Sequence, residues 1–160
     1  MPIEFNLKQE LQKFTFSNKI KVQFGQVDAI GILYNIQYFS IFENGRTNYL
    51  QNLNFINNLK DFVKFPVMTV AHSIDYFNPA EFLDEIEIFT RVSQIGNSSI
   101  VFESLAVKNN DLLLSKLSST YVYIDLQTRK SISIPEFIKQ KFLDFENGNV
   151  ILTNGSNEKN

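Results

Sequence analysis

The chain has 160 residues, about the size of one ordinary domain, and we expect a single core. Its 15 Lys and Arg residues nearly balance 17 Asp and Glu residues, and neither sign forms a long block, so we expect no nucleic-acid partner. The absence of cysteine excludes disulfides, thiolate metal sites and a cysteine nucleophile, and it fits a reducing, cytoplasmic compartment.

Residues 1–18 are expected to be an N-terminal extension with one short surface helix, because Leu7, Leu11 and Phe14 recur at helical spacing. The first residues, MPIEFNLKQE, lack the basic start and apolar run of a signal peptide, and no stretch approaches transmembrane length. We therefore expect a soluble protein with no membrane contact. A half-buried strand should follow over residues 19–26, where IKVQFGQ alternates apolar and polar residues.

A long helix is predicted from about Asn35 to Leu50, because apolar residues recur there at helical spacing. The stripe consists of Tyr38, Ile41, Phe42, Gly45 and Tyr49, and Phe39 and Leu50 widen it. Such a helix is mostly buried. Glycine costs about 1 kcal/mol relative to alanine inside a helix, so Gly45 indicates that another part of the chain comes close at that point.

Four long strands are predicted after a polar connection, with turn residues between them. The strands are expected at residues 66–77, 84–95, 98–108 and 112–125, and the turns at Asn78-Pro79, Gly96-Asn97 and residues 109–111. Gly, Asn and Asp tolerate the backbone conformations of tight reversals. Consecutive hairpins would arrange these strands as an antiparallel meander.

The end of the chain should hold one more helix. Pro135 is well placed in a first turn, and Phe137, Ile138 and Phe142 would share one side of the helix that it opens. Residues 147–160 are predicted to be a flexible C-terminal tail.

This order of elements predicts an α+β domain over residues 19–146, in which one antiparallel sheet wraps around a long central helix. The predicted strand 84–95 carries Ile86, Ile88 and Val92 on one face and Phe89 on the other. A sheet that covers a helix and still has apolar residues on its second face implies a second buried surface. We therefore expect a homodimer or a homotetramer.

Three segments carry a family resemblance. The first reads DAIGILYNIQY over residues 28–38 and continues with ENGR over residues 43–46; the second spans residues 74–103, and the third is YVYIDLQTRKSISIP over residues 121–135. In this order they resemble the hotdog-fold acyl-CoA thioesterases of the 4-hydroxybenzoyl-CoA thioesterase-like group, over roughly residues 19–143. The resemblance implies a hotdog fold and hydrolysis of an acyl or aryl thioester, on coenzyme A or an acyl carrier protein. Beyond the coenzyme A of the substrate it implies no cofactor.

Asp28 lies where the predicted strand gives way to the helix. Thioester hydrolysis needs a carboxylate that attacks the carbonyl or activates water, and a donor for the developing oxyanion. Asp28 can supply the carboxylate, and the helix start near Asn35 offers unpaired backbone N–H groups. An aspartate before a helix is, however, more often a cap or a turn former. The resemblance implies the catalytic role for Asp28 and the oxyanion-donating N–H near Asn35.

Four further residues are expected to contact the substrate. Gly31 would let the loop turn tightly close to a ligand, and Tyr34 belongs to the same signature. Ser98 and Ser99 sit in a turn whose N–H and hydroxyl groups suit a phosphate, although a hairpin uses such residues for geometry alone. In similar proteins this turn lies near the pantetheine and nucleotide.

Two positions depart from the family pattern. Many relatives have a second acid where Gln26 stands, and the bacterial short-chain branch often has histidine where Asn35 stands. Asparagine cannot carry a proton at neutral pH, so base chemistry should fall on Asp28 alone. A non-catalytic acyl-thioester binding module is therefore the alternative function.

Glu43 and His72 stay open as site residues. A distinct aryl-CoA thioesterase branch takes its catalytic glutamate from this helix, but an ion pair with Arg46 is the commoner role for Glu43. His72, on the strand face of Met68, Val70, Ile74 and Tyr76, either packs or lines the acyl pocket. A dehydratase on the same fold would need a histidine near the site, and His72 is in another segment. With one histidine and scattered carboxylates, we expect no metal site.

Overall fold

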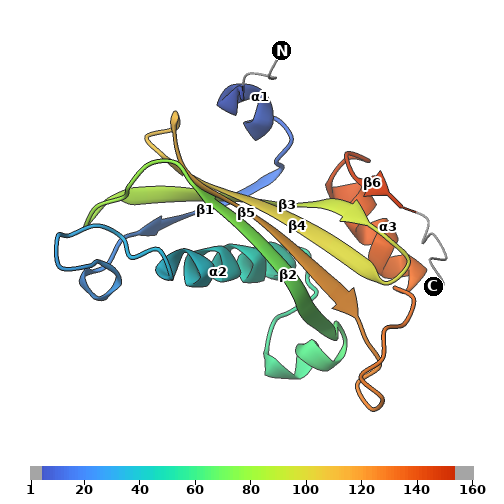
Figure 1. Cartoon of the computed structure of the whole chain (residues 1–160). Coiled ribbons are helices and arrows are strands. Elements are labelled where there is room, and N and C mark those ends of the chain that lie inside the picture. Colours follow the sequence, from blue (N-terminus) through green and yellow to red (C-terminus); the bar gives the residue numbers. More distant parts are fainter. Residues whose placement is uncertain (1–4, 154–160) are drawn as a thin grey trace, which may run out of the picture.

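An antiparallel sheet wraps around one long helix in the computed structural model, which describes residues 5–153 (Figure 1). The elements in chain order are α1 (Leu7–Leu11), β1 (Phe16–Lys21), the 3₁₀ helix η1 (Phe24–Gln26), α2 (Gln37–Asn52), the 3₁₀ helix η2 (Leu59–Val63), β2 (Val67–Tyr76), β3 (Glu85–Ile95), β4 (Ser99–Lys108), β5 (Leu112–Tyr123), α3 (Glu136–Phe145) and β6 (Ile151–Leu152). The predicted α+β architecture is confirmed.

The strand order in the sheet is β1-β3-β4-β5-β2, with the short β6 added in parallel to β3. Only β3, β4 and β5 form the predicted meander. The expected hairpin between β2 and β3 was wrong, because β2 pairs with β5 from Val67 opposite Tyr123 to Tyr76 opposite Ser115. The link 77–84 instead runs beside the loop that precedes α2, where the Leu33 N–H donates to the Ala80 carbonyl at 2.8 Å. Placing β2 at the far edge lets the sheet curve around both sides of the helix.

α2 packs on the sheet through Gly45, as the sequence predicted. A Cβ atom at Gly45 would lie 2.7 Å from Cγ2 of Ile88 and 3.1 Å from Oγ1 of Thr90, both on β3. The buried positions of α2 are Tyr38, Ile41, Phe42, Gly45, Tyr49 and Leu50, which is the predicted stripe without Phe39. The helix therefore approaches β3 more closely than any side chain would allow.

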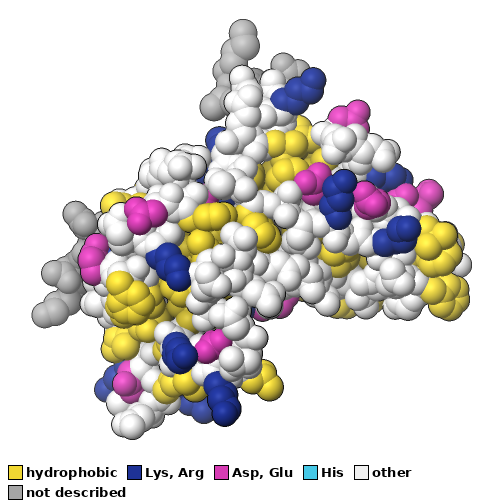
Figure 2. Space-filling view, turned by 180° about the vertical axis from the view of Figure 1, so that it is seen from behind, with side chains coloured by type: hydrophobic (Ala, Val, Ile, Leu, Met, Phe, Trp, Pro, Cys, Tyr) yellow, Lys and Arg dark blue, Asp and Glu magenta, His cyan; other side chains and the backbone are white. Residues whose placement is uncertain are grey.

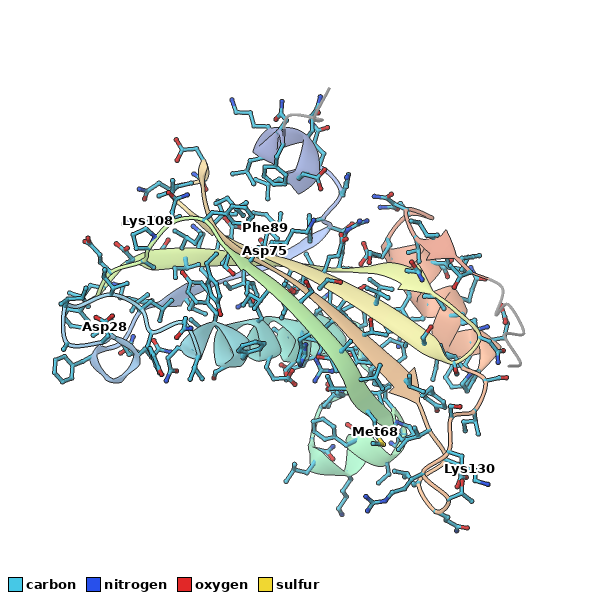
Figure 3. The ribbon with its side chains drawn as sticks, in the orientation of Figure 1. Asp28, Met68, Asp75, Phe89, Lys108 and Lys130 are labelled. Carbon is cyan, nitrogen blue, oxygen red and sulfur yellow. The ribbon has the colours of Figure 1, made fainter. Side chains whose placement is uncertain are left out.

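Part of the second face of the sheet, around Phe89, is covered by the N-terminal segment of the same chain. Leu7, Leu11 and Phe14 pack over the apolar side chains of Leu105, Val107, Leu113 and Phe89. The rings of Phe14 and Phe89 are 6.1 Å apart, and Figure 3 shows Phe89 on the side of the sheet where α1 lies. Phe89 thus gives no reason to expect a subunit interface on this face.

β1 differs from its prediction in position. It begins at Phe16 rather than at residue 19, and it ends at Lys21, so residues 16–18 of the expected extension belong to the sheet. The last part of the predicted strand is η1, because the side chain of Gln26 accepts from the Gln23 N–H at 2.8 Å and closes a turn.

The C-terminal helix α3 forms at its predicted place, with Pro135 before its first residue. Ile138 and Phe142 are buried in the core, but Phe137 is 71 % exposed, so the prediction that it shares their side of the helix was wrong. Adjacent residues of an α-helix point in different directions, so residues 137 and 138 cannot share one narrow face.

Residues 147–153, part of the predicted flexible tail, fold back onto the sheet. Gly148 takes the left-handed φ of +73° that reverses the chain after α3. The Asn149 carbonyl then accepts from Arg91 Nη1 at 3.3 Å, and β6 pairs with Gln94 and Ile95 of β3. The remaining positions of that predicted tail, 154–160, lie outside the described residues.

The surface carries mixed charge. On the face shown in Figure 2, Lys and Arg side chains are interspersed with Asp and Glu, and no region of a single sign stands out. Within residues 5–153, no helix combines the length and the apolar character needed to cross a bilayer.

One carboxyl group lies inside the core at the end of α3. Glu146 is 2 % exposed, and its Oε1 accepts from the Tyr49 hydroxyl at 2.5 Å and from the Val92 N–H at 3.1 Å. Among the described residues its Oε2 has no hydrogen-bond partner. Burial raises the pKa of Glu146 above its ordinary value of 4.5, against the opposing effect of these hydrogen bonds and of Arg91.

Replacing Gly45 with alanine should destabilise the protein. Alanine is the better helix former by about 1 kcal/mol, but the stiff, fully buried Ile88 side chain leaves its methyl no room. We expect the free energy of unfolding, measured by chemical denaturation, to fall by about 1–3 kcal/mol. Gly25→Ala is the control, since a Cβ there meets nothing within 4 Å. A Gly45→Ala variant more stable than the wild type would contradict the close approach.

The buried carboxyl of Glu146 should make stability depend on pH. Because its pKa is raised on folding, its stabilising contribution is fully present below the ordinary value of 4.5 and is lost as pH rises through the folded-state pKa. The Glu146→Gln variant lacks this loss. The melting temperature of Glu146→Gln minus that of the wild type should therefore increase as the pH rises above 4.5. For Glu136→Gln, which changes an exposed side chain, this difference should stay constant. A constant difference for Glu146→Gln across this range would refute the assignment.

Candidate active site

The loop between η1 and α2 is built around the side chain of Asp28. Its Oδ1 accepts from the N–H groups of Ile30 at 2.9 Å and Ile32 at 3.1 Å. Gly31 takes a φ of +81° and donates its N–H to the Asp28 carbonyl at 3.0 Å. Asp28 is thus a turn former, the common role of aspartate before a helix. The turn also holds its carboxylate in place, while Oδ2 accepts no hydrogen bond from the described residues.

The two ends of this loop meet beside the start of α2. The Tyr34 N–H donates to the Gln26 carbonyl at 2.9 Å, and Val27 forms a bridge with Leu33. These contacts join the chain just before Asp28 to the chain just before Asn35. The structure therefore brings the predicted carboxylate and the predicted helix start together in one loop.

The open N–H groups lie just before α2, because those of its first turn, on Gln37, Tyr38 and Phe39, donate to the carbonyls three residues earlier. The N-cap residue of α2 is Ile36, which offers no side-chain acceptor. Within the described part of the chain, the N–H groups of Asn35 and Ile36 donate to no acceptor. The Asn35 carbonyl is occupied instead, since the Tyr76 hydroxyl donates to it at 3.1 Å. Open N–H groups and the positive end of the helix dipole make this a place where a negative oxygen is stabilised.

A cleft of about 290 Å³ opens next to these N–H groups. Its walls are Leu33, Asn35, Tyr38, Tyr76, Phe77, Asn78 and Pro79. The Tyr38 and Tyr76 rings pack edge to face at 5.4 Å, and burial, followed by the influence of Tyr76 and Asp84, raises the pKa of Tyr38 to about 12. Tyr38 is therefore a neutral hydroxyl at physiological pH and cannot act as a base. The cleft is largely apolar, with Asn35 at its edge.

Asn35 is the one predicted site residue among the walls of this cleft; Asp28, whose side chain is exposed, and the signature residues Gly31 and Tyr34 lie in the same loop but are not among those walls. Gly31 provides the reversal that the turn requires, as predicted. Tyr34 is 48 % exposed and does not line the cleft. The predicted substrate contacts of both residues remain predictions.

Ser98 and Ser99 lie at the other end of the sheet. They belong to the β3–β4 hairpin, where the Gly96 N–H donates to the Ser99 carbonyl at 2.8 Å. The Asp28 loop adjoins the opposite end of β3, near Glu85 (Figures 1 and 3). The ten steps along β3 correspond to about 33 Å. Within one chain, the two serines are not brought together with Asp28.

A second hollow, also of about 290 Å³, lies farther along α2, between this helix and β2. We call it the central hollow; its polar walls are Ser40, Glu43, Arg46, His72, Ser104 and Ser119. Nδ1 of His72 and Oγ of Ser119 are 2.7 Å apart, and the His72 ring is 5.6 Å from that of Phe39. His72 therefore lines a cavity, and Glu43 forms the ion pair with Arg46 that its spacing suggested.

A β-bulge decides which side chains of β2 face α2. Pairing with β5 shifts by one residue between Thr69 and Ala71, so the alternation changes phase there. After the bulge, the side chains of β2 that pack toward α2 are those of His72 and Tyr76. Before the bulge, the side chains that line a hollow are those of Val67 and Thr69. The predicted common face of His72 with Met68 and Val70 was wrong for this reason.

The stacking of Arg46 on Tyr121 is a site feature that the sequence did not indicate. The Arg46 guanidinium lies 4.5 Å above the centre of the Tyr121 ring, at one end of the central hollow. Tyr121 comes from β5, and no local pattern links it to α2. Among residues 5–153, no three His, Asp or Glu side chains are grouped so that they could hold a metal ion.

A family model and a relative of known name both match most of this chain. Residues 22–142 match the family model of the thioesterase-like superfamily. The acyl-CoA thioesterase YbgC of Haemophilus influenzae is 33 % identical over 130 residues, which cover 79 % of this chain and 93 % of that protein.

Solved structures show the same architecture. A 1,4-dihydroxy-2-naphthoyl-CoA thioesterase from Synechocystis matches with a TM-score of 0.72 and 20 % identity, covering 81 % of this chain and 96 % of the other. A thioesterase from Thermus thermophilus, complexed with coenzyme A and Zn, matches with a TM-score of 0.74 and 21 % identity. The match covers 85 % of this chain and 98 % of the other. At such identities the likeness concerns the fold.

Proposed function

This chain belongs to the thioesterase-like superfamily and is a thioester hydrolase with a hotdog fold, and we propose that it cleaves acyl-CoA at the Asp28 loop. One observation carries the proposal. The free Oδ2 of Asp28 and the open N–H groups of Asn35 and Ile36 belong to one closed loop, and Asn35 lines a cleft. These are the base and the oxyanion donor that thioester hydrolysis requires.

The reaction can proceed with these groups alone. Asp28 takes a proton from water, and the resulting hydroxide adds to the thioester carbonyl. The N–H groups of Asn35 and Ile36 hold the oxyanion, which then collapses and expels the coenzyme A thiolate. The thiolate takes a proton back, so that free acid and coenzyme A leave and Asp28 is restored. Direct attack by the Asp28 carboxylate, followed by hydrolysis of the anhydride, is the second route open to the same residue.

The Asn35 side chain has a lesser role in this scheme. Its amide can orient a water molecule or donate to the carbonyl, but it cannot transfer a proton at neutral pH. No metal or other cofactor is needed in either route. The coenzyme A bound in the Thermus structure supports coenzyme A as the carrier, and the cysteine-free composition supports a cytoplasmic location.

The edge strand β2 suggests how two copies assemble. It is ten residues long, ends the sheet, and exposes most of its side chains, including Met68 and Val70. A long, apolar, unpaired edge is a template for another strand. We propose a homodimer, or a dimer of such dimers, in which two copies of β2 pair antiparallel about a twofold axis.

Such a dimer would join the separated site residues. Antiparallel pairing sets the Tyr76 end of β2, near Asn35, beside the Val67 end of the partner's β2. Val67 pairs with Tyr123, whose N–H donates to the Ser98 carbonyl at 2.7 Å. The partner's Ser98 and Ser99 would then lie three strands, about 14 Å, beyond the edge. This distance suits contacts with the nucleotide end of a coenzyme A whose thioester lies at Asp28.

The purified protein should release thiol from at least one acyl-CoA in the presence of EDTA, because neither route needs a metal.

The substitution Asp28→Asn should lower turnover about 10²–10⁴-fold, because the amide cannot act as a base. The amide can still accept from Ile30 and Ile32, so the melting temperature should change little. Asp125→Asn is a matched control, because Asp125 accepts from Gln127 at 3.0 Å and Thr128 at 2.7 Å in a similar turn.

Three results would overturn this assignment. Near-normal turnover in Asp28→Asn would place the chemistry elsewhere, with Glu43→Gln and His72→Gln as the next variants to assay. Tight acyl-CoA binding without thiol release would indicate a binding module. Loss of hydrolysis on chelation would show that a metal takes part.

The dimer predicts a specific effect of charge on β2. The protein should sediment as a dimer or tetramer at micromolar concentration, and Val70→Lys should shift it toward monomer and reduce turnover. Val70 is 58 % exposed, so the monomer should stay folded. Phe137→Lys, on the exposed side of α3, is the control and should leave the sedimentation unchanged. A wild-type protein that sediments as an active monomer would exclude the shared site.

A further inference from the structure

Three hollows lie in line between α2 and β2. The cleft beside Asn35 comes first, the central hollow second, and a third, the distal hollow of about 280 Å³, lies under η2. α2 and β2 run in opposite directions, since Asn35 contacts Tyr76, Phe39 contacts His72, and both Arg46 and Thr69 line the distal hollow. The three hollows therefore follow one another along the gap between α2 and β2, starting at the proposed oxyanion site, and we call this line of hollows the groove. The cleft and the central hollow have no wall residue in common, whereas the central and distal hollows share two.

The central and distal hollows differ in chemistry. The central hollow has hydroxyl, imidazole and charged groups in its walls. The distal hollow is mostly apolar, with Ile56, Phe62, Phe65, Val67, Ile124 and Leu126 among its walls. A long alkyl chain would gain most from the distal hollow, because burying apolar surface there leaves few polar groups without water.

Arg46 and Tyr121 stand between these two hollows. Both residues line both of them, so the pair is their common wall. The guanidinium rests 4.5 Å above the Tyr121 ring, and Nε of Arg46 also donates to Oε2 of Glu43 at 3.2 Å. The Arg46 side chain is only 12 % exposed. It is held from one side by an aromatic ring and from the other by a carboxylate.

We propose that Arg46, stacked on Tyr121, ends the acyl groove and excludes long alkyl chains from the distal hollow. The inference rests on the proposed function, since it takes the thioester to lie at Asn35. From Asn35 to Arg46 the helix rises about 16 Å, which leaves room for short and medium acyl groups. A longer chain would have to lift the guanidinium off the ring and away from Glu43.

The test is the acyl-chain profile of Arg46→Met, which keeps a long side chain and removes the charge. Hydrolysis of butanoyl-, octanoyl- and hexadecanoyl-CoA is measured below micellar concentrations. The wild type should prefer the two shorter substrates. In Arg46→Met, the ratio of kcat/KM for hexadecanoyl-CoA to that for butanoyl-CoA should rise at least about tenfold. Lys8→Met, which removes an exposed cation from α1 on the other face of the sheet, should keep the wild-type ratio.

Binding of non-hydrolysable thioethers separates this inference from the proposed function. S-butyl- and S-hexadecyl-CoA are titrated calorimetrically into the wild type and Arg46→Met, and the same shift should appear in the affinity ratio. If no acyl-CoA is hydrolysed but this affinity ratio shifts, the exclusion of long chains by Arg46 (the barrier) is supported and the proposed function is refuted. If the wild type already prefers hexadecanoyl-CoA, or the ratios do not change, the barrier is refuted while hydrolysis at Asp28 stands. Arg46→Gln, too short to cover the ring, gives the same test if Arg46→Met does not fold.

Discussion

The contact between Gly45 and β3 sets the position of everything else in the molecule. Because no Cβ intervenes, α2 lies directly against Ile88 and Thr90. This close approach lets the sheet curve around the helix, so that β1 and β2, the two ends of the strand order, lie on either side of α2. The N-terminus of α2 then meets the Asp28 loop, while the middle of the helix faces β2 across the groove. A larger residue at position 45 would move the helix and, with it, both the proposed catalytic loop and the acyl groove.

Asp28 shows how one residue can serve the fold and the chemistry together. Its Oδ1 closes the turn, and its Oδ2 is left available. Asp125 forms a similar turn with Gln127 and Thr128, so the turn alone does not distinguish the two aspartates. The difference lies in the neighbours, because only the Asp28 turn is joined to a helix start with open N–H groups. The apolar N-cap Ile36 is unfavourable for helix stability. The N–H groups of Asn35 and Ile36 donate to no acceptor within the described residues, so they are free for a ligand.

The apolar surface of this sheet has two different explanations. On the face opposite α2, the apolar side chains around Phe89 are covered by α1 and Phe14 from the same chain, so they do not indicate a subunit interface. The edge strand β2 is a separate feature, with backbone groups and apolar side chains exposed together. A second β2 strand would satisfy those backbone groups and would also bring the hairpin of Ser98 to the Asp28 end of the first chain. The proposed assembly and the proposed coenzyme A contacts therefore depend on the same edge.

The sequence by itself determined the features that arise from neighbouring residues. The periods of the helix and the long strands, the close approach at Gly45 and the loop joining Asp28 to Asn35 all depend on residues a few positions apart, where backbone geometry is local. The tertiary structure decided what depends on segments far apart in the chain. Those features are the pairing of β2 with β5, the bulge at Val70, the parallel pairing of β6 with β3, and the stacking of Arg46 on Tyr121. A turn signal such as Asn78-Pro79 shows that the chain bends, but the strand that pairs with β2 is chosen by how the whole sheet closes around α2.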